Sequence, residues 1–229
     1  MKIGIMQPYL FPYIGYWQLI KAVDTYVVYD DAAYIKGGWI NRNNYLFIND
    51  KKLFTIQIKG ASSYKLIKDI EIIDSFSNFI KMLKNNYSKA PYFLKTMELI
   101  NKIISFDKCN LALFISNSIQ VILDYLNINV DVILSSSVNK NDALKGKDKV
   151  IDICKVLNAS DYYNAIGGME LYNKQEFLQN NIKLFFLKTN ITWYKQFNND
   201  FIPGLSIIDI MMFNSIKEIN LMLDNFDLI

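Results

Sequence analysis

Hydrophobic and polar positions in the first 30 residues follow the pattern of a parallel strand–helix–strand unit. A short apolar run at residues 2–6 predicts a buried strand. Apolar side chains then recur at helical spacing over residues 13–23, after Pro12, a residue that suits the start of a helix. The β-branched and aromatic run at residues 25–29 predicts a second strand. Two such strands joined by a helix form a right-handed βαβ crossover.

The rest of the chain changes period twice. Two strand-like runs, residues 45–48 and 53–58, predict a hairpin whose loop is the four residues 49–52. Apolar residues three and four apart then predict three helices, over residues 76–87, 91–104 and 111–126. The α/β alternation resumes with strands expected at 130–134, 161–164 and 183–187 and helices at 148–157, 175–181, 207–213 and 216–226. The pattern predicts one α/β domain over residues 1–229, a Rossmann-like parallel sheet with an inserted β-hairpin and a helical layer inserted at about 75–128.

Composition places this domain in an ordinary globular class. The 229 residues are 52% apolar and include only four prolines and nine glycines, which excludes disorder and low-complexity structure. The longest uncharged run, residues 110–123, is too short to span a membrane, which takes about 20 mostly apolar residues. We expect no signal peptide, and reduced thiols at Cys109 and Cys154 in a cytoplasmic protein.

The chain has no histidine. It therefore cannot supply a Ser-His or Cys-His pair, a histidine-ligated zinc site or an imidazole acid or base. A general base must be a carboxylate, a lysine, a tyrosine or a group on the substrate. Most common hydrolase mechanisms are excluded.

The net charge of +3 comes almost entirely from lysine, because Arg42 is the only arginine. A single arginine in a lysine-rich chain suggests a position that needs the planar five-donor guanidinium; a chance survivor on the surface is the alternative. The sequence shows no Lys/Arg stripe, and one arginine is a poor set of base-reading groups. Nucleic acid is therefore not an expected partner.

Unusual residues cluster at the predicted strand ends. In an open parallel sheet, ligands bind outside the carboxyl ends of the strands, where loops and helix N-termini gather. The first four parallel strands are followed, in turn, by Gln7-Pro8, Asp30-Asp31, Ser135-Ser136-Ser137 and Gly167-Gly168. This coincidence favours a small-molecule site over a scaffold.

Several charged residues have two interpretations. Adjacent residues of an extended backbone point to opposite faces, so one of Asp30 and Asp31 would accept a proton or hold a metal or a ribose while the other turns away. A solvated turn is the alternative. The charged cluster at residues 145–149 could bind phosphates at the start of a helix. We prefer the alternative, a solvated helix end. Asp209 lies in an apolar helix and needs a partner. Arg42 would give a bidentate pair; a lysine or simple exposure are the alternatives.

Longer motifs resemble the WbqC-like family. They are Met6–Tyr16 (MQPYLFPYIGY), Tyr29-Asp30-Asp31, Lys36–Asn43 (KGGWINRN), Tyr163–Gly168 (YNAIGG) with Tyr172, Tyr194–Phe197, Phe201–Asp209 (FIPGLSIID) and Asn214. The match runs from the first strand to the penultimate helix. Many members carry His where this chain has Met6, and Val-Gln where it has Ala32-Ala33. The resemblance implies a bacterial cytoplasmic protein associated with O-antigen or other surface-polysaccharide genes.

On this basis we predict a transferase that modifies a nucleotide-activated amino sugar, forming an amide from an acyl or aminoacyl donor such as glycine. Such a reaction needs a neutral amine, a proton acceptor and donors around a developing oxyanion. The catalytic residues we expect are Asp30 or Asp31 as the base, and Arg42, which holds a phosphate or a carboxylate. Asn41, Asn43 and the Gly167-Gly168 amides are the expected donors. Substrate contacts are expected from Gln7, Pro8, Tyr16, Trp39, Asn41, Asn43, Gly167, Gly168, Gln196 and Asp209.

The alternative is a non-catalytic protein of polysaccharide assembly that binds a sugar nucleotide or a protein partner. The absence of histidine favours it. Neither hypothesis firmly implies a cofactor; ATP or an activated acyl or aminoacyl donor are the candidates, and no metal site is assigned. The expected partner is a nucleotide-linked sugar, with no membrane span, and a homodimer is left open.

Overall fold

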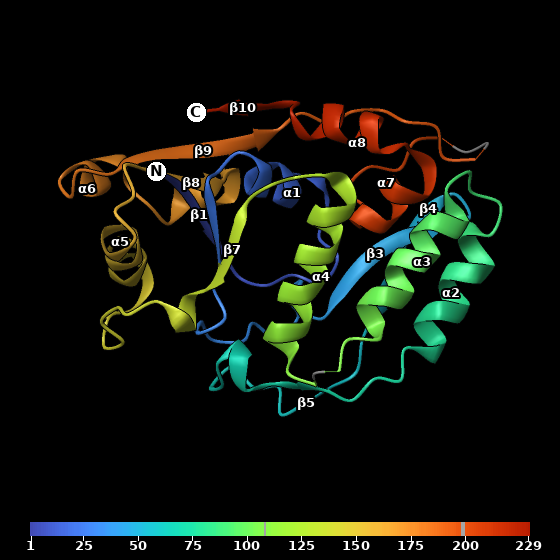
Figure 1. The fold of residues 1–229 in the computed structure, drawn as a ribbon, viewed down its shortest axis with the longest axis horizontal. Coiled ribbons are helices and arrows are strands. Elements are labelled where there is room, and N and C mark those ends of the chain that lie inside the picture. Colours follow the sequence, from blue (N-terminus) through green and yellow to red (C-terminus); the bar gives the residue numbers. More distant parts are fainter. Residues whose placement is uncertain (108, 198–199) are drawn as a thin grey trace.

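The computed structural model describes residues 1–107, 109–197 and 200–229. Its centre is a sheet with the strand order β10-β9-β8-β1-β2-β7 (Figure 1). Five of these strands are parallel, and β10 pairs antiparallel with β9 at one edge. The Rossmann-like fold class is therefore confirmed. The strands are β1 (Lys2–Met6), β2 (Thr25–Val28), β7 (Asp131–Leu134), β8 (Asp161–Ala165), β9 (Lys183–Thr189) and β10 (Phe226–Leu228).

Helices cover both faces of this sheet because its strands alternate between two apolar faces. Ile3 and Val27 pack with α5 (Gly146–Val156) and α6 (Lys174–Leu178) on one face. Tyr26 and Tyr163 lie on the other face, in the core shared with α1 (Ile14–Lys21), α4 (Leu111–Leu126) and α8 (Ile216–Leu223). In Figure 1, α5 and α6 lie to the left of the sheet and α1 and α4 to its right. The result is a three-layer α/β/α arrangement.

A helical layer and a hairpin extend the second core away from the sheet (Figure 1). Ring contacts join them, with the centroids of Phe54 of the hairpin and Phe79 of the helical layer 5.1 Å apart, and those of Phe76 and Phe114 within that layer 5.3 Å apart. The remaining elements are β3 (Arg42–Phe47), β4 (Asp50–Thr55), β5 (Ile58–Lys59), β6 (Glu71–Ile72), α2 (Ser77–Tyr87), α3 (Phe93–Ile104), α7 (Ile207–Phe213) and the 3-10 turns η1 (Ile67–Asp69), η2 (Ser135–Ser137) and η3 (Ile166–Glu170).

Two predicted elements differ from the structure. The hairpin loop has two residues rather than four, because Phe47 pairs with Asp50. The polar residues 50–52 are exposed strand, which in sequence looks like a loop. The last helix ends at Leu223, and the expected helical residue Phe226 begins β10.

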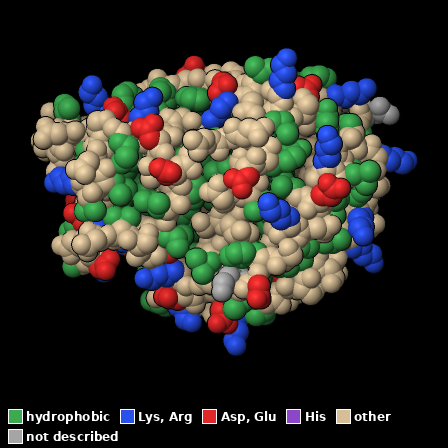
Figure 2. Space-filling model, viewed as in Figure 1, with side chains coloured by type: hydrophobic (Ala, Val, Ile, Leu, Met, Phe, Trp, Pro, Cys, Tyr) green, Lys and Arg blue, Asp and Glu red, His purple; other side chains and the backbone are tan. Residues whose placement is uncertain are grey.

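No helix in the described residues is long and apolar enough to cross a membrane. On the face shown in Figure 2, lysine and acidic side chains are interspersed.

Candidate functional site

The strand order reverses between β1 and β8. From β1 the chain passes to β2 and β7 on one side, and then returns to β8 and β9 on the other. Loops diverge at such a point, leaving a crevice at the carboxyl ends of the strands. A pocket of about 350 Å³ opens there, and its lining is Ile5, Met6, Gln7, Tyr9, Tyr29, Ile35, Asn164, Ala165, Gly167, Gly168, Leu171 and Tyr172. We call it the tyrosine pocket.

The diglycine segment shapes one wall of the tyrosine pocket. A Cβ atom on Gly168 would lie 2.7 Å from the amide nitrogen of Asn164, too close for any side chain. Asn164 is itself fixed, because its amide donates to the Tyr162 hydroxyl at 3.1 Å and its oxygen accepts from the Ala165 N–H at 2.7 Å. A Cβ on Gly167 would meet no atom within 4 Å. Only Gly168 is therefore sterically required.

A second pocket of about 680 Å³ continues from the tyrosine pocket and shares Tyr29 with it. We call it the lysine pocket; its lining is Tyr29, Asp31, Ala32, Ala33, Leu66, Lys68, Asp142, Leu144, Lys145, Gly146 and Lys149. Helix α5 begins here, and no side chain caps its first turn. Its free N–H groups and positive dipole end favour an anion. Within the described chain, Lys68 and Lys145 have no carboxylate partner.

The aspartate pair holds β2 to η2 below these pockets. Asp30 accepts hydrogen bonds from the Ser136 N–H at 2.9 Å, the Ser136 hydroxyl at 2.6 Å and the Ser135 hydroxyl at 3.1 Å. The Ser135 hydroxyl is also hydrogen-bonded to Asp31. Both carboxylates therefore converge on one serine, and the expectation that one of them turns away is wrong. The backbone leaves its extended conformation at the end of β2, so strict alternation no longer applies.

Asp31 also pairs with two buried ammonium groups. Its Oδ2 lies 2.7 Å from Lys140 Nζ and 2.8 Å from Lys149 Nζ. Burial raises the pKa of Asp31, but the hydrogen bonds from Lys140, Lys149 and Ser135 outweigh it and hold the pKa below its usual value. A carboxylate with a lowered pKa is a weak proton acceptor. These contacts favour a supporting role for Asp31.

Arg42 stands apart from the aspartates. Its Nε donates to the Gly38 carbonyl at 2.9 Å, and its guanidinium carbon lies 5.9 Å from the centre of the Trp39 ring. It makes no ion pair with any described residue and does not line either pocket. The same turn reaches the tyrosine pocket through Ile35, whose carbonyl accepts from the Gly38 N–H. Arg42 and the 42% exposed Trp39 thus sit on a turn that borders the crevice.

Three of the predicted contact residues are buried and use their polar groups within the protein. Asn41 donates to the Ile56 carbonyl at 2.9 Å and accepts from Tyr34. Asn43 donates to two backbone carbonyls, at 3.0 and 2.8 Å. The Tyr16 ring is 3% exposed, and its hydroxyl donates to the carbonyl of Gln7 at 2.9 Å. Asn43 and Tyr16 thus brace the loop after β1, and Asn41 braces the segment at Ile56. Gln7 itself lines the tyrosine pocket, and Pro8 next to it is buried.

Asp209 does not pair with Arg42, so that expectation is wrong. Its buried carboxylate accepts from the hydroxyls of Tyr87 at 2.9 Å and Tyr194 at 2.6 Å and from the amide of Gln196 at 2.7 Å. Burial raises the pKa of Asp209 to about 6, although the three hydrogen bonds lower it. The neutral hydroxyl and amide donors thus take the place of the expected Arg42 guanidinium. Asp209 binds Gln196, which is hydrogen-bonded to the backbone of Ile202, and neither Asp209 nor Gln196 lines the two pockets of the crevice.

Sequence reasoning missed the ion pairs that Asp31 forms with Lys140 and Lys149. Lys140 and Lys149 are far from Asp31 in the chain, and nothing in the local pattern marks Lys140. The 145–149 cluster carried a signal, but a solvated helix end was the preferred interpretation. Among the described residues, no group of three acidic or cysteine side chains is placed to hold a metal ion.

The chain matches the model of the WbqC-like protein family over residues 7–221. It belongs to the WbqC-like family. The Uncharacterized protein Rv1507c of Mycobacterium tuberculosis is 27% identical over 222 residues, covering 92% of each chain. No solved structure gives a significant match. Both pockets of the crevice lie within the residues matched to the WbqC-like family, apart from two pocket residues of β1, Ile5 and Met6.

Proposed function

We propose that this WbqC-like protein binds a nucleotide-activated amino sugar in the crevice and transfers an acyl or aminoacyl group to its amine. The role in O-antigen or other surface-polysaccharide biosynthesis follows from the family resemblance. The observation that carries the proposal is the juxtaposition of an aromatic pocket and a cationic pocket at the point where strand order reverses. A sugar nucleotide has the same two parts, flat or ring-shaped groups on either side of an anionic diphosphate.

The diphosphate fits the lysine pocket. Lys68 and Lys145 supply free ammonium groups, and the uncapped first turn of α5 supplies N–H donors. Helix N-termini of this kind bind phosphate through both their N–H groups and their dipole. The other ammonium of the pocket, on Lys149, is already neutralised by Asp31 at 2.8 Å.

The ring-shaped parts fit the tyrosine pocket. Tyr9, Tyr29 and Tyr172 present rings that stack on a base or pack on a sugar face. The open space beside Gly167 lets a ligand approach the backbone closely. Trp39, with Arg42 over its ring, stands on the bordering turn and supplies a further cation for the second phosphate or for a carboxylate.

Amide formation requires that the sugar amine attack the acyl carbon. One C–N bond forms as the bond between the acyl carbon and its leaving group breaks. The leaving group departs with that electron pair and takes up the proton lost by the nitrogen. Asp142 carries an accessible carboxylate, with its side chain 87% exposed, but it lines the lysine pocket, where the diphosphate is placed. The proton acceptor is therefore placed on the substrate, because the carboxylates of Asp30 and Asp31 are occupied by serine and lysine donors and none of the described lining residues of the tyrosine pocket is acidic.

Titration calorimetry with UDP- and dTDP-linked amino sugars tests the binding step. Lys68→Ala and Lys145→Ala should each weaken binding about tenfold, and high salt should reduce the difference. Lys89→Ala, an exposed lysine in the α2–α3 connection, is the matched control and should change nothing. Binding that is equal in all four proteins would refute the placement of the diphosphate.

A binding protein without catalysis is the second candidate. The observation that favours it is the saturation of both buried carboxylates by internal donors. Mass spectrometry of the sugar nucleotide, after incubation with acyl and aminoacyl donors, separates the two functions. A transferase yields a heavier sugar nucleotide, whereas a binding protein leaves its mass unchanged. Binding without product from any donor supports the second candidate.

A further inference from the structure

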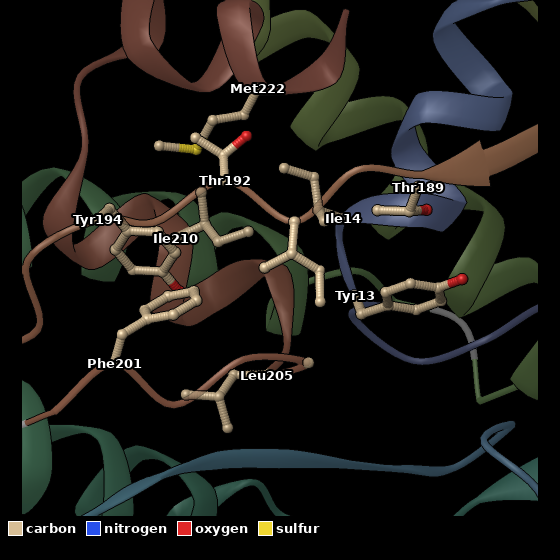
Figure 3. Close-up of a pocket in the computed structure, with 11 residues that line it drawn as sticks. Tyr13, Ile14, Thr189, Thr192, Tyr194, Phe201, Leu205, Ile210 and Met222 are labelled. Atoms are coloured by element: carbon tan, nitrogen blue, oxygen red, sulfur yellow. The ribbon is translucent and has the colours of Figure 1, made fainter. Parts of the chain in front are cut away.

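A third pocket lies along the same edge of the sheet, beyond the carboxyl end of β9 (Figure 3). Its volume is about 200 Å³. It is built from the start of α1, the end of β9, the segments 191–194 and 201–205, and the helices α7 and α8. A hollow of this size admits a small group, since pockets for drug-sized ligands measure about 300–1,000 Å³.

The lining of this pocket is mostly apolar and includes no charged side chain. Ile14, Leu205, Ile210 and Met222 line it, and no lysine, aspartate or glutamate does. Figure 3 shows the rings of Tyr194 and Phe201 closing one end. Their centroids are 5.1 Å apart at an interplanar angle of 73°. The Tyr194 hydroxyl is held by Asp209, so the pocket meets its ring rather than its polar end.

The opposite end is polar and faces the crevice. Figure 3 shows Thr189 and Tyr13 there, and their side chains are hydrogen-bonded to each other. A Cβ atom on Gly15 would lie 2.3 Å from the Thr189 hydroxyl oxygen and 2.6 Å from that of Tyr13, so only glycine admits this pair. On the neighbouring strands, Leu187 of β9 pairs with Ala165 of β8, and Thr189 follows Leu187 at the end of β9. Ala165 lines the tyrosine pocket, so the polar end lies at the same edge of the sheet, one strand away from the crevice.

We infer that this third pocket binds a short, uncharged aliphatic chain of about four to six carbons, with its polar head at Thr189 and Tyr13. An apolar cavity of about 150 Å³ holds a benzene ring, so about 200 Å³ accommodates a chain of this length. Uncharged walls exclude a free carboxylate or an ammonium from the interior. The assignment of this chain to the acyl donor, whose reactive carbon would emerge toward the amino sugar, rests on the proposed function.

The test uses acetamide, butanamide and hexanamide as probes, with affinity measured by NMR titration of the full chain. Each buried methylene is worth about fourfold in affinity. Hexanamide should therefore bind at least tenfold more tightly than acetamide and give nuclear Overhauser effects to the rings of Tyr194 and Phe201. Equal affinity for the three amides, or contacts elsewhere on the protein, would overturn the inference.

Filling the pocket supplies a second readout. Ile210→Phe and Met222→Phe should each weaken hexanamide binding at least tenfold in the folded protein. Leu94→Phe, at an exposed position of α3, is the matched control and should leave it unchanged. Undiminished binding to a folded, filled variant contradicts the inference.

The crevice is tested separately in the same samples. Lys145→Ala should lose sugar-nucleotide affinity and keep hexanamide affinity. Hexanamide binding in a protein that binds no sugar nucleotide supports the aliphatic pocket and contradicts the proposed function. Sugar-nucleotide binding without hexanamide binding supports the proposed function and contradicts the aliphatic pocket.

Discussion

Removing the charge of Asp31 should destabilise the protein by about 3–5 kcal/mol. Asp31→Asn preserves the shape of the side chain but leaves two ammonium groups facing it without compensation. The Lys140 side chain is 1% exposed and that of Lys149 is 10% exposed, so water cannot replace the lost carboxylate. Loss of one partner from a buried ion pair typically costs about 3–5 kcal/mol.

Remaining contacts of the two lysines place the expected loss near the lower end of this range. Lys140 lies 3.6 Å from the exposed carboxylate of Asp142 and also donates to the Ser135 carbonyl. Lys149 donates to the Asp31 carbonyl at 3.1 Å, a contact that the substitution leaves in place. We therefore expect about 3 kcal/mol.

Urea denaturation at pH 7 measures this loss, with Asp131→Asn as the matched control. Asp131 is exposed at the start of β7 and pairs with no described lysine, so its substitution should change stability by less than about 0.5 kcal/mol. A second variant, Asp31→Asn with Lys140→Met, removes one uncompensated charge. It should be more stable than the sum of the single substitutions predicts. A loss below about 1 kcal/mol in Asp31→Asn would refute the reasoning.

Acid titration gives the same pair an independent signature. The folded protein holds the pKa of Asp31 below its unfolded value of about 3.9. Its contribution to stability is therefore present above about pH 4 and is lost as pH falls through the folded pKa. The wild-type protein should lose this part of its free energy of unfolding in acid, and Asp31→Asn should not.

Three further predictions concern single side chains. The pKa of Asp209 is raised to about 6, so its contribution to stability is present below about pH 4 and is lost as pH rises through 6. This pH dependence amounts to at most about 3 kcal/mol of the free energy of unfolding, and urea denaturation of Asp209→Asn should no longer show it. Gly168→Ala should destabilise the protein by about 1–3 kcal/mol in thermal melts because its Cβ collides with Asn164, whereas Gly167→Ala should be tolerated. Asn43→Ala leaves the buried Leu10 carbonyl without its donor, whereas the Phe11 carbonyl still accepts from the Ser206 hydroxyl. It should cost about 1–3 kcal/mol in urea denaturation, and an unchanged midpoint would contradict its bracing role.

Local patterns predicted the elements well where a single rule decides them. The strand at residues 2–6 and the helix at 207–213 have the predicted boundaries, and Ser215 and Glu218 form the expected capping box. Ser206 caps α7 by accepting the Ile208 N–H, also as predicted. Each of these features depends on residues that are close to one another in the sequence. The missed strand β10 depends instead on β9, with which it pairs across almost 40 residues of chain.

The candidate site was predictable in position but not in its contacts. Parallel strands bring their carboxyl ends together whatever the side chains are, so Gln7 and the diglycine segment could be placed at one edge. Whether a carboxylate there faces solvent or a buried lysine depends on residues more than 100 positions away. Asp31 and Lys140 illustrate this, since no local pattern near either residue refers to the other. The same limit applies to Asp209, whose donors come from α2 and the segment after β9.

The buried cluster also determines which charges a ligand meets. Asp30 and Asp31 carry two negative charges, and Lys140 and Lys149 carry two positive charges, so the cluster at the base of the crevice is neutral. Its field largely cancels at the distance of a ligand. The attraction on an anion therefore comes from the outer lysines of the pocket and from the first turn of α5. Because these outer groups are reached by solvent, salt should weaken anion binding while leaving the buried pairs, and hence the fold, almost unaffected.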